Sequence, residues 1–307
     1  MTDYVLNTQN LCKQYNKQMI LDNVNMKIQK GDIYGFIGAN GAGKTSLIRL
    51  ITGLTFPTEG EISLFGAKGA LETNEQRKRI GCIIESPALY EDMTAYQNVE
   101  VQRIQKGIPG KKCVEEVLQV VNLDASNKKK VKHFSLGMKQ RLALAIALLG
   151  NPEFLILDEP LNGLDPMGII ELRNLLVKLN KEKQITLLVS SHILTELHQL
   201  ATCYGIIHNG QLIEQLSLDE LNERCKKHIY LKVDDASKAT AIIETKLKSD
   251  HFKVYPDQVI KLYDCLGQIG EVSKTLSSNG IIIEEISTKG DDLETYFTKL
   301  VGGHTYA

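Results

Sequence analysis

The chain has no excess of charge of either sign, since 36 basic and 37 acidic side chains give a net charge of −1 over 307 residues. This balance gives no indication of nucleic acid or an anionic bilayer as a partner. Its six cysteines are scattered, and no two of them form a C-x-x-C pair. This spacing argues against a zinc site and against a disulfide framework, and it is typical of a reducing cytosol.

Long hydrophobic runs are also missing. The longest purely apolar run, residues 142–149, is far shorter than the roughly 20 residues that cross a bilayer. Residues 1–10 contain no apolar core of a signal peptide. We therefore expect a cytoplasmic protein without a membrane span of its own, so that any work at a membrane needs another chain.

The strongest motif is a glycine-rich loop between a strand and a helix. Residues 38–45 match the phosphate-binding pattern G-x-x-x-x-G-K-[ST]. An apolar strand is predicted before it, over residues 33–37, and apolar side chains repeat at helical spacing over residues 47–54. The glycines let backbone N–H groups surround a phosphate, and the helix N-terminus attracts the same anion. We expect Lys44 to reach the β- and γ-phosphates of a nucleoside triphosphate and the Thr45 hydroxyl to ligate Mg²⁺.

Two carboxylates follow a second apolar strand, which is predicted over residues 154–157. They lie at its carboxyl end, where ligands bind in open α/β sheets. Asp158 is predicted to hold Mg²⁺, usually through water, and Glu159 to polarise the attacking water. His192 follows another apolar strand, residues 185–189, at the same sheet edge. Its imidazole is predicted to bind the γ-phosphate and to orient the water.

The order of predicted elements indicates two domains, residues 1–222 and 228–307. The first alternates strands and helices, which predicts an α/β fold with a parallel sheet and a helical insertion over residues 93–149. Strands are predicted near residues 4–6, 24–28, 33–37, 61–64, 80–84, 154–157, 185–190 and 204–208, with Tyr15 in a loop after the first. A closing helix and linker are expected over residues 216–227, with Ser217 as the N-cap.

The second domain is predicted to be a small α+β unit. Strands are expected over residues 228–233, 252–255, 259–263 and 281–286, and helices over 236–248, 266–277 and 291–300. This β-α-β-β-α-β order is that of ferredoxin-like domains, and an irregular helical tail is the alternative. The segment contains no phosphate loop, metal-ligand cluster or catalytic pair, so position alone suggests an interaction or regulatory role.

Residues 134–141, Phe-Ser-Leu-Gly-Met-Lys-Gln-Arg, resemble the signature motif of ABC ATPases. Together with the motifs above and Asp165, they reproduce the layout of an ABC cassette over about residues 4–215. The resemblance implies a P-loop NTPase fold with a mainly parallel sheet, an antiparallel β part and a helical subdomain. It implies ATP and Mg²⁺ as ligands, with Tyr15 stacked on adenine. The phosphates would be wrapped by Gly38, Ala39, Asn40, Gly41, Ala42, Gly43, Lys44, Thr45 and Ser46.

The resemblance also implies a second cassette, because Ser135 and Gly137 would contact the γ-phosphate bound by a partner. Asp165 would communicate between the two sites. Hydrolysis would then need two cassettes clamped head-to-tail, with a membrane permease as a further partner. The pair is expected to be a homodimer, although a heterodimer stays open. Catalysis would rest on Glu159, His192 and Lys44.

Three positions depart from the commonest cassette pattern. Leu136 and Met138 stand where the signature usually has glycine and glutamine. Glu85 stands where most cassettes have glutamine, and its carboxylate is expected to approach Mg²⁺ or the lytic water. Glutamate here, followed by Ser-Pro-Ala-Leu-Tyr, resembles the ATPases of bacitracin-type exporters and lantibiotic immunity transporters. The predicted function is therefore ATP-driven export of an antimicrobial peptide, with another exporter or importer subfamily, or a non-transport ABC ATPase, as alternatives.

Overall fold

The computed structural model describes residues 4–85, 88–290 and 293–303, and the chain divides into two compact units, Met1–Leu218 and Asp219–Ala307. We call them the N-terminal unit and the C-terminal unit. Each has a hydrophobic core of its own. The sequence led us to expect the boundary between residues 222 and 228. None of the helices in the described ranges is long and apolar enough to cross a membrane.

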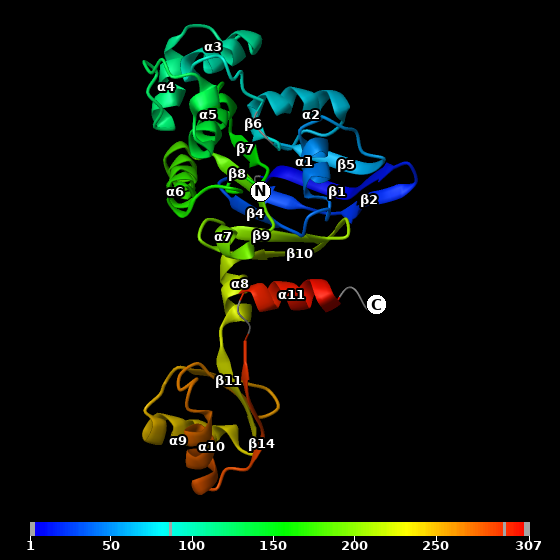
Figure 1. Cartoon of the computed structure of the whole chain (residues 1–307). Helices are drawn as coiled ribbons and strands as arrows, with labels where there is room; N and C mark the ends of the chain where they lie inside the picture. Colours follow the sequence, from blue (N-terminus) through cyan, green and yellow to red (C-terminus); the bar gives the residue numbers. More distant parts are fainter. Residues whose placement is uncertain (1–3, 86–87, 291–292, 304–307) are drawn as a thin grey trace. The chain divides into compact units, whose positions relative to one another are not determined.

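A six-stranded sheet forms the centre of the N-terminal unit, with the strand order β10-β9-β4-β8-β7-β6 (Figure 1). The inner strands are parallel, and β10 adds to β9 in the antiparallel direction. Strands β4, β7 and β8 read as nearly continuous apolar runs because both of their faces are buried. The bounds are β4 Ile33–Ile37, β6 Ile80–Ile83, β7 Phe154–Leu157, β8 Thr186–Ser191, β9 Cys203–His208 and β10 Gln211–Ser217.

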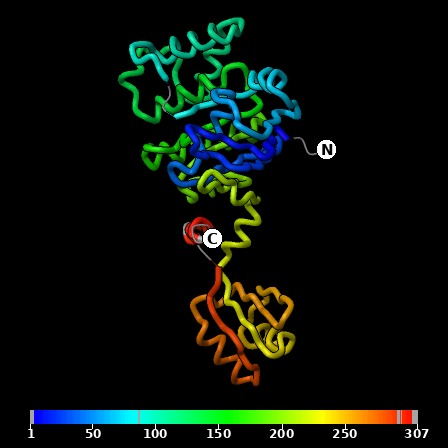
Figure 2. Tube along the Cα trace, turned by 90° about the vertical axis from the view of Figure 1, so that its right-hand side faces the viewer, coloured from blue at the N-terminus to red at the C-terminus, as the bar shows by residue number. Residues whose placement is uncertain are grey.

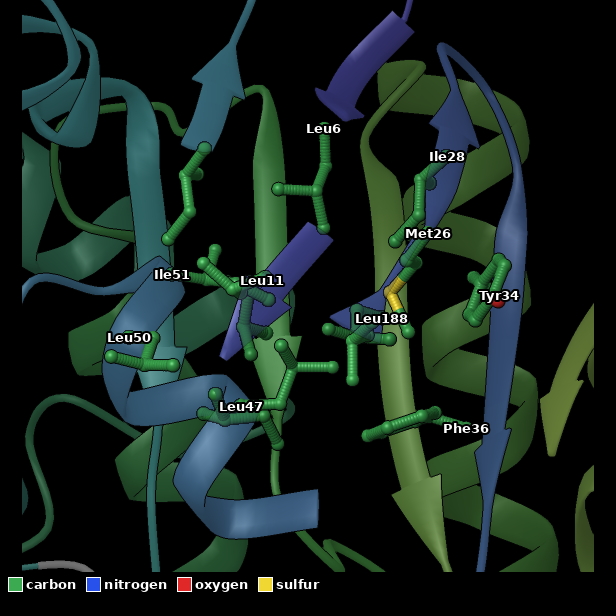
Figure 3. Packing of buried hydrophobic residues seen from close by; sticks show 14 of the residues in the cluster. Leu6, Leu11, Met26, Ile28, Tyr34, Phe36, Leu47, Leu50, Ile51 and Leu188 are labelled. Atoms are coloured by element: carbon green, nitrogen blue, oxygen red, sulfur yellow. The ribbon is translucent and has the colours of Figure 1, made fainter. Parts of the chain in front are cut away.

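A second, antiparallel sheet packs against helix α1 (Lys44–Ile51) and the six-stranded sheet. Its strands are β1 Tyr4–Tyr15, β2 Gln18–Val24, β3 Lys27–Gln29 and β5 Glu59–Leu64. Figure 3 shows Leu47, Leu50 and Ile51 of α1 among the buried side chains of both sheets. This core fixes the helix that begins directly after the phosphate-binding loop, because burial of its apolar face holds it between the two sheets.

The prediction of a single strand near residues 24–28 is wrong, because β2 ends at Val24 and β3 begins only at Lys27. The Thr8 hydroxyl donates to the Val24 carbonyl at 2.9 Å and accepts from the Met26 amide at 2.8 Å. These side-chain bonds take the place of ladder bonds, so the backbone turns at this point. Tyr15 also differs from its predicted place in a loop: it is the last residue of β1.

The predicted helical insertion is present. Helices α3 Ala95–Gln105, α4 Lys112–Val120 and α5 Leu136–Leu148 pack on one another (Figure 1). Helix α3 begins with a capping box in which Thr94 and Gln97 bond each other's backbone amides. The remaining helices of this unit are α2 Ala70–Gln76, η1 Arg77–Arg79, η2 Val131–His133, α6 Pro166–Lys183 and α7 Leu194–His198.

The C-terminal unit has the predicted β-α-β-β-α-β order, in an antiparallel sheet with strand order β12-β13-β11-β14. The first and last strands, β11 and β14, run side by side (Figure 2), with β14 at one edge of the sheet and β11 paired on its other side with β13. This is the ferredoxin-like arrangement. Helices α9 and α10 contribute to a core that contains Ile229, Leu231 and Leu276. The bounds are α8 Leu218–Cys225, β11 His228–Val233, α9 Ala236–Ile242, η3 Ile243–Leu247, β12 Phe252–Tyr255, β13 Val259–Leu262, α10 Ile269–Ser278, β14 Ile283–Lys289 and α11 Leu293–Gly303.

The closing helix and linker predicted over 216–227 contain helix α8, Leu218–Cys225, and Ser217 directly precedes this helix as the last residue of β10. One boundary in this region differs from the sequence prediction. The predicted helix over 266–277 begins three residues later, at Ile269, because Cys265 has a left-handed backbone (φ 59°) and Gly267 follows it. Residues 291–292 of the predicted last helix lie outside the described residues.

Candidate nucleotide-binding site

The glycine-rich loop joins β4 to α1 at the carboxyl edge of the six-stranded sheet. Two of its glycines have positive φ, 82° at Gly41 and 110° at Gly43. A Cβ atom on Gly38 would lie 2.6 Å from Ile207, and one on Gly43 would lie 2.8 Å from Leu21. The loop is thus packed so tightly that side chains are excluded at these positions. The first turn of α1, including Ser46, presents its backbone N–H groups at the end of the loop.

Lys44 is folded back beneath the loop. Its ammonium group is 5% exposed and donates hydrogen bonds to the carbonyl oxygens of Gly38, at 2.7 Å, and Ala39, at 3.3 Å. It also lies 3.3 Å from Glu159 Oε1. A buried ammonium group needs such partners, because an unpaired charge away from water is strongly unfavourable.

Asp158 is buried at the end of β7 and holds two hydroxyl groups. Thr45 Oγ1 donates to Asp158 Oδ2 at 2.7 Å, and Ser190 Oγ donates to Asp158 Oδ1 at 2.5 Å. Ser190 also accepts a hydrogen bond from the Glu159 amide at 2.9 Å. One serine therefore fixes both members of the acidic pair. Sequence reasoning assigned no role to it, although a polar residue at the end of the apolar run 185–189 was a usable signal.

Glu159 has a left-handed backbone, with φ of 48°, which costs a non-glycine residue about 1–2 kcal/mol. Its carboxylate is surrounded by Lys44, His192 Nδ1 at 3.1 Å and Asn162 Nδ2 at 3.4 Å. Asn162 is another neighbour without a role in the sequence prediction. A cavity of about 150 Å³ adjoins this group. It is lined by Glu159, Leu161, Asn162, Gly163, Leu164, Ile169, Ser190, Ser191, His192, Ile193 and Glu196.

Glu85 lies just past β6 with φ of 59°, and its carboxylate forms an ion pair with Arg49 of α1 at 2.5 Å. Tyr15 is 41% exposed at the end of β1, and the Lys13 ammonium lies over its ring, 4.6 Å from the centroid. The structure thus gives Glu85 and Tyr15 partners that the sequence did not indicate.

Ser135 and Gly137 lie at the start of α5, and Asp165 directly precedes α6. Ser135 accepts from the Met138 amide at 3.3 Å, and Asp165 accepts from the Gly168 amide at 2.6 Å, so both are N-caps. A Cβ atom on Gly163 would lie 3.1 Å from Leu136 Cδ2, so Leu136 lies beside this glycine. Within the described residues, no hydrogen bond or ion pair joins these three to the phosphate-binding loop.

The Thr45 hydroxyl and the Asp158 carboxylate form an oxygen donor set that fits Mg²⁺. This ion takes one or two carboxylate-type ligands from a protein and keeps water and substrate phosphates for the rest. A site built from three or more His, Cys, Asp or Glu side chains is absent from the part of the chain that the structure describes. A magnesium ion here would therefore depend on phosphate oxygens of the nucleotide.

The loop, the acidic pair and the histidine at one sheet edge define a nucleoside triphosphate site of the P-loop class. The sequence profile of the ABC transporter family matches residues 21–162. The bacitracin transport ATP-binding protein BcrA of Bacillus licheniformis is 44% identical over 98% of both chains. The lantibiotic transport ATP-binding protein SrtF of Streptococcus pyogenes is 44% identical over 70% of this chain and 92% of its own.

Solved structures agree with this assignment. The dimeric post-hydrolysis structure of the ATP-binding cassette MJ0796, bound to ADP and Pi, superposes with a TM-score of 0.63. It is 27% identical and covers 69% of this chain and 98% of that one. The cbiO1 structure from Clostridium perfringens, part of the ABC transporter complex cbiONQ, has a TM-score of 0.66 at 26% identity, with 80% and 97% covered. The chain belongs to the ABC family and is the ATP-binding subunit of an ABC transporter.

Proposed function

We propose that this subunit hydrolyses MgATP and that a membrane permease uses the energy to export an antimicrobial peptide of the bacitracin or lantibiotic type. The observation that carries the proposal is the cluster of Lys44, Asp158, Glu159 and His192 around one loop end. Each member has the chemistry of one step in phosphoryl transfer to water.

The proposed roles follow from these contacts. Lys44 exchanges the Gly38 carbonyl for the β- and γ-phosphates. Glu159 then accepts a proton from the attacking water, and His192 bonds the γ-phosphate and orients that water. Thr45 and Asp158 hold Mg²⁺, which when bound supplies positive charge to the phosphate oxygens. Tyr15 stacks on the adenine ring.

We infer that two cassettes complete each site. Ser135 and Asp165 are the N-caps of α5 and α6, and in this proposal they and Gly137 contact the nucleotide on a second copy. The relative MJ0796 is dimeric in its ADP-bound and Pi-bound form. A head-to-tail homodimer at the cytoplasmic face of the membrane, docked on a permease, is the proposed working state.

The cargo class rests on the relatives and on Glu85. BcrA and SrtF carry the names of bacitracin and lantibiotic transport, and BcrA matches this chain over both units. Deleting the gene in its host should increase killing by one of these peptides, and only the wild-type gene should restore tolerance. If bacitracin and several lantibiotics all kill the deletion strain and its parent equally, the proposed cargo is wrong.

The experiment that tests the enzyme is Glu159→Gln. The variant keeps the shape of the side chain but loses the base, so it should bind ATP, lose at least roughly 100-fold in turnover and accumulate as a closed dimer. Phosphate release and size-exclusion chromatography with ATP measure both effects. Turnover near the wild-type rate would contradict the assignment of Glu159.

A further inference from the structure

An exposed ion pair links helix α1 to the segment after β6. Arg49 approaches Glu85 Oε1 to 2.5 Å, and their side chains are 42% and 60% exposed. Arg49 also lies in the last turn of α1, where a positive charge interacts favourably with the helix dipole. Surface pairs of this kind are easily exchanged for other partners, because solvent screens them and their net stabilisation is small.

The two residues of this pair border the proposed magnesium ligands. Arg49 follows Thr45 by four positions on α1, so both side chains project from one face of the helix. Across the sheet, the Asp158 amide donates to the Ile83 carbonyl at 2.9 Å, which places the start of the Glu85 segment beside Asp158. Arg49 thus lies on the helix that carries Thr45, and Glu85 follows the strand β6, which pairs with the strand β7 that Asp158 follows.

A carboxylate at this place creates an electrostatic problem that a neutral glutamine does not. Glu85 adds negative charge near Asp158 and near the phosphates of a bound nucleotide, and like charges repel. Arg49 supplies a counter-charge. The Glu85 carboxylate is paired with Arg49, and binding to magnesium would require it to leave that partner.

We propose that Arg49 is a positioning residue for Glu85. It holds the carboxylate on α1, and Glu85 reaches Mg²⁺ of a bound nucleotide only by giving up this ion pair. The inference rests on the proposed binding of MgATP by Thr45 and Asp158. In this arrangement, Arg49 and Mg²⁺ compete for the Glu85 carboxylate. The strength of the ion pair then sets the Mg²⁺ concentration at which nucleotide binds.

The test is a titration of the full-length protein with Mg²⁺ at a fixed concentration of the fluorescent nucleotide TNP-ATP, so that binding is read without turnover. Arg49→Gln should lower the half-saturating Mg²⁺ concentration about two- to fivefold, the range of exposed ion pairs. Arg49→Lys keeps a positive charge and should remain close to wild type. Glu85→Gln should raise the half-saturating concentration.

The double variant separates positioning from a direct charge effect. In a Glu85→Gln background, Arg49→Gln should produce no further decrease in the half-saturating Mg²⁺ concentration. Lys112→Gln is the matched control, because it removes a positive charge from an exposed pair with Glu116 on α4. It should leave the titration unchanged.

Two results would overturn the proposal. One is an unchanged Mg²⁺ titration in Arg49→Gln, and the other is an equal shift from Arg49→Gln in the wild-type and Glu85→Gln backgrounds. A wild-type chain that binds TNP-ATP without any dependence on Mg²⁺ would instead contradict the proposed function, and the inference would fall with it. The titration therefore distinguishes the two failures.

Discussion

Replacing Ser190 by alanine tests whether a single hydroxyl group holds the two acidic residues in place. Ser190 is fully buried, donates to Asp158 Oδ1 at 2.5 Å and accepts from the Glu159 amide at 2.9 Å. Alanine removes both bonds and leaves no polar atom to replace them. The Glu159 amide would lose this partner directly beside a left-handed backbone.

The expected loss of stability can be worked from these two bonds. A hydrogen bond to a charged group contributes about 1.5–3 kcal/mol, and a buried donor left without a partner costs about 1–3 kcal/mol. Part of each loss is recovered when water or a neighbouring group adjusts. We expect Ser190→Ala to lower the free energy of unfolding of the N-terminal unit by about 2–4 kcal/mol. Turnover should fall as well, because Glu159 is no longer held at its strained φ.

Urea unfolding followed by circular dichroism, alongside a phosphate-release assay, measures both quantities. Ser191→Ala is the matched control, since its hydroxyl bonds Glu196 and the Ile193 amide instead of the acidic pair. The control should retain more turnover than Ser190→Ala. If Ser190→Ala costs less than about 0.5 kcal/mol and retains full turnover, the serine does not position the acidic residues.

Two further predictions concern the loop and the C-terminal unit. Gly43→Ala should cost about 2–4 kcal/mol and weaken ATP binding at least tenfold, because its Cβ would lie 2.8 Å from Leu21 at φ of 110°. Calorimetric titration with ATP measures the affinity, and Gly41→Ala is the control, since its Cβ would meet nothing within 4 Å. Equal losses of ATP affinity in the two variants would refute the packing argument. We also propose that the C-terminal unit steadies the dimer. Deleting residues 228–307 should then reduce ATP-induced dimerisation in size-exclusion chromatography, and unchanged dimerisation, turnover and peptide tolerance would refute this role.

Strands β4, β7 and β8 were readable from the sequence because burial on both faces leaves a continuous apolar run, whereas the partly exposed strand β10 was not predicted. The runs at 154–157 and 185–189 became β7 and β8, and polar residues follow each of them at the predicted edge. The glycine loop was readable for a related reason. Its backbone conformation needs glycine at specific positions, so the spacing of the glycines in the sequence indicates that conformation.

The partners of the site residues could not be predicted in the same way. Neither the ion pair of Arg49 with Glu85 nor the position of Lys13 over Tyr15 follows from periodicity or from a motif. These contacts join surface side chains, and the Arg49 pair depends on how α1 packs beside the segment after β6. The break between β2 and β3 is a similar case, because it depends on hydrogen bonds that the Thr8 hydroxyl of the neighbouring strand donates to Val24 and accepts from Met26.

The closed set of contacts at the loop has a consequence for the order of events in catalysis. Lys44 is almost fully buried, and Gly38, Ala39 and Glu159 satisfy its charge. In the roles we propose, a phosphate that binds to Lys44 displaces these partners and releases Glu159 Oε1. This oxygen then becomes available to accept a proton from water only when the nucleotide is already in place. We therefore propose that the lysine that binds the substrate also keeps this oxygen of the base occupied until the substrate arrives.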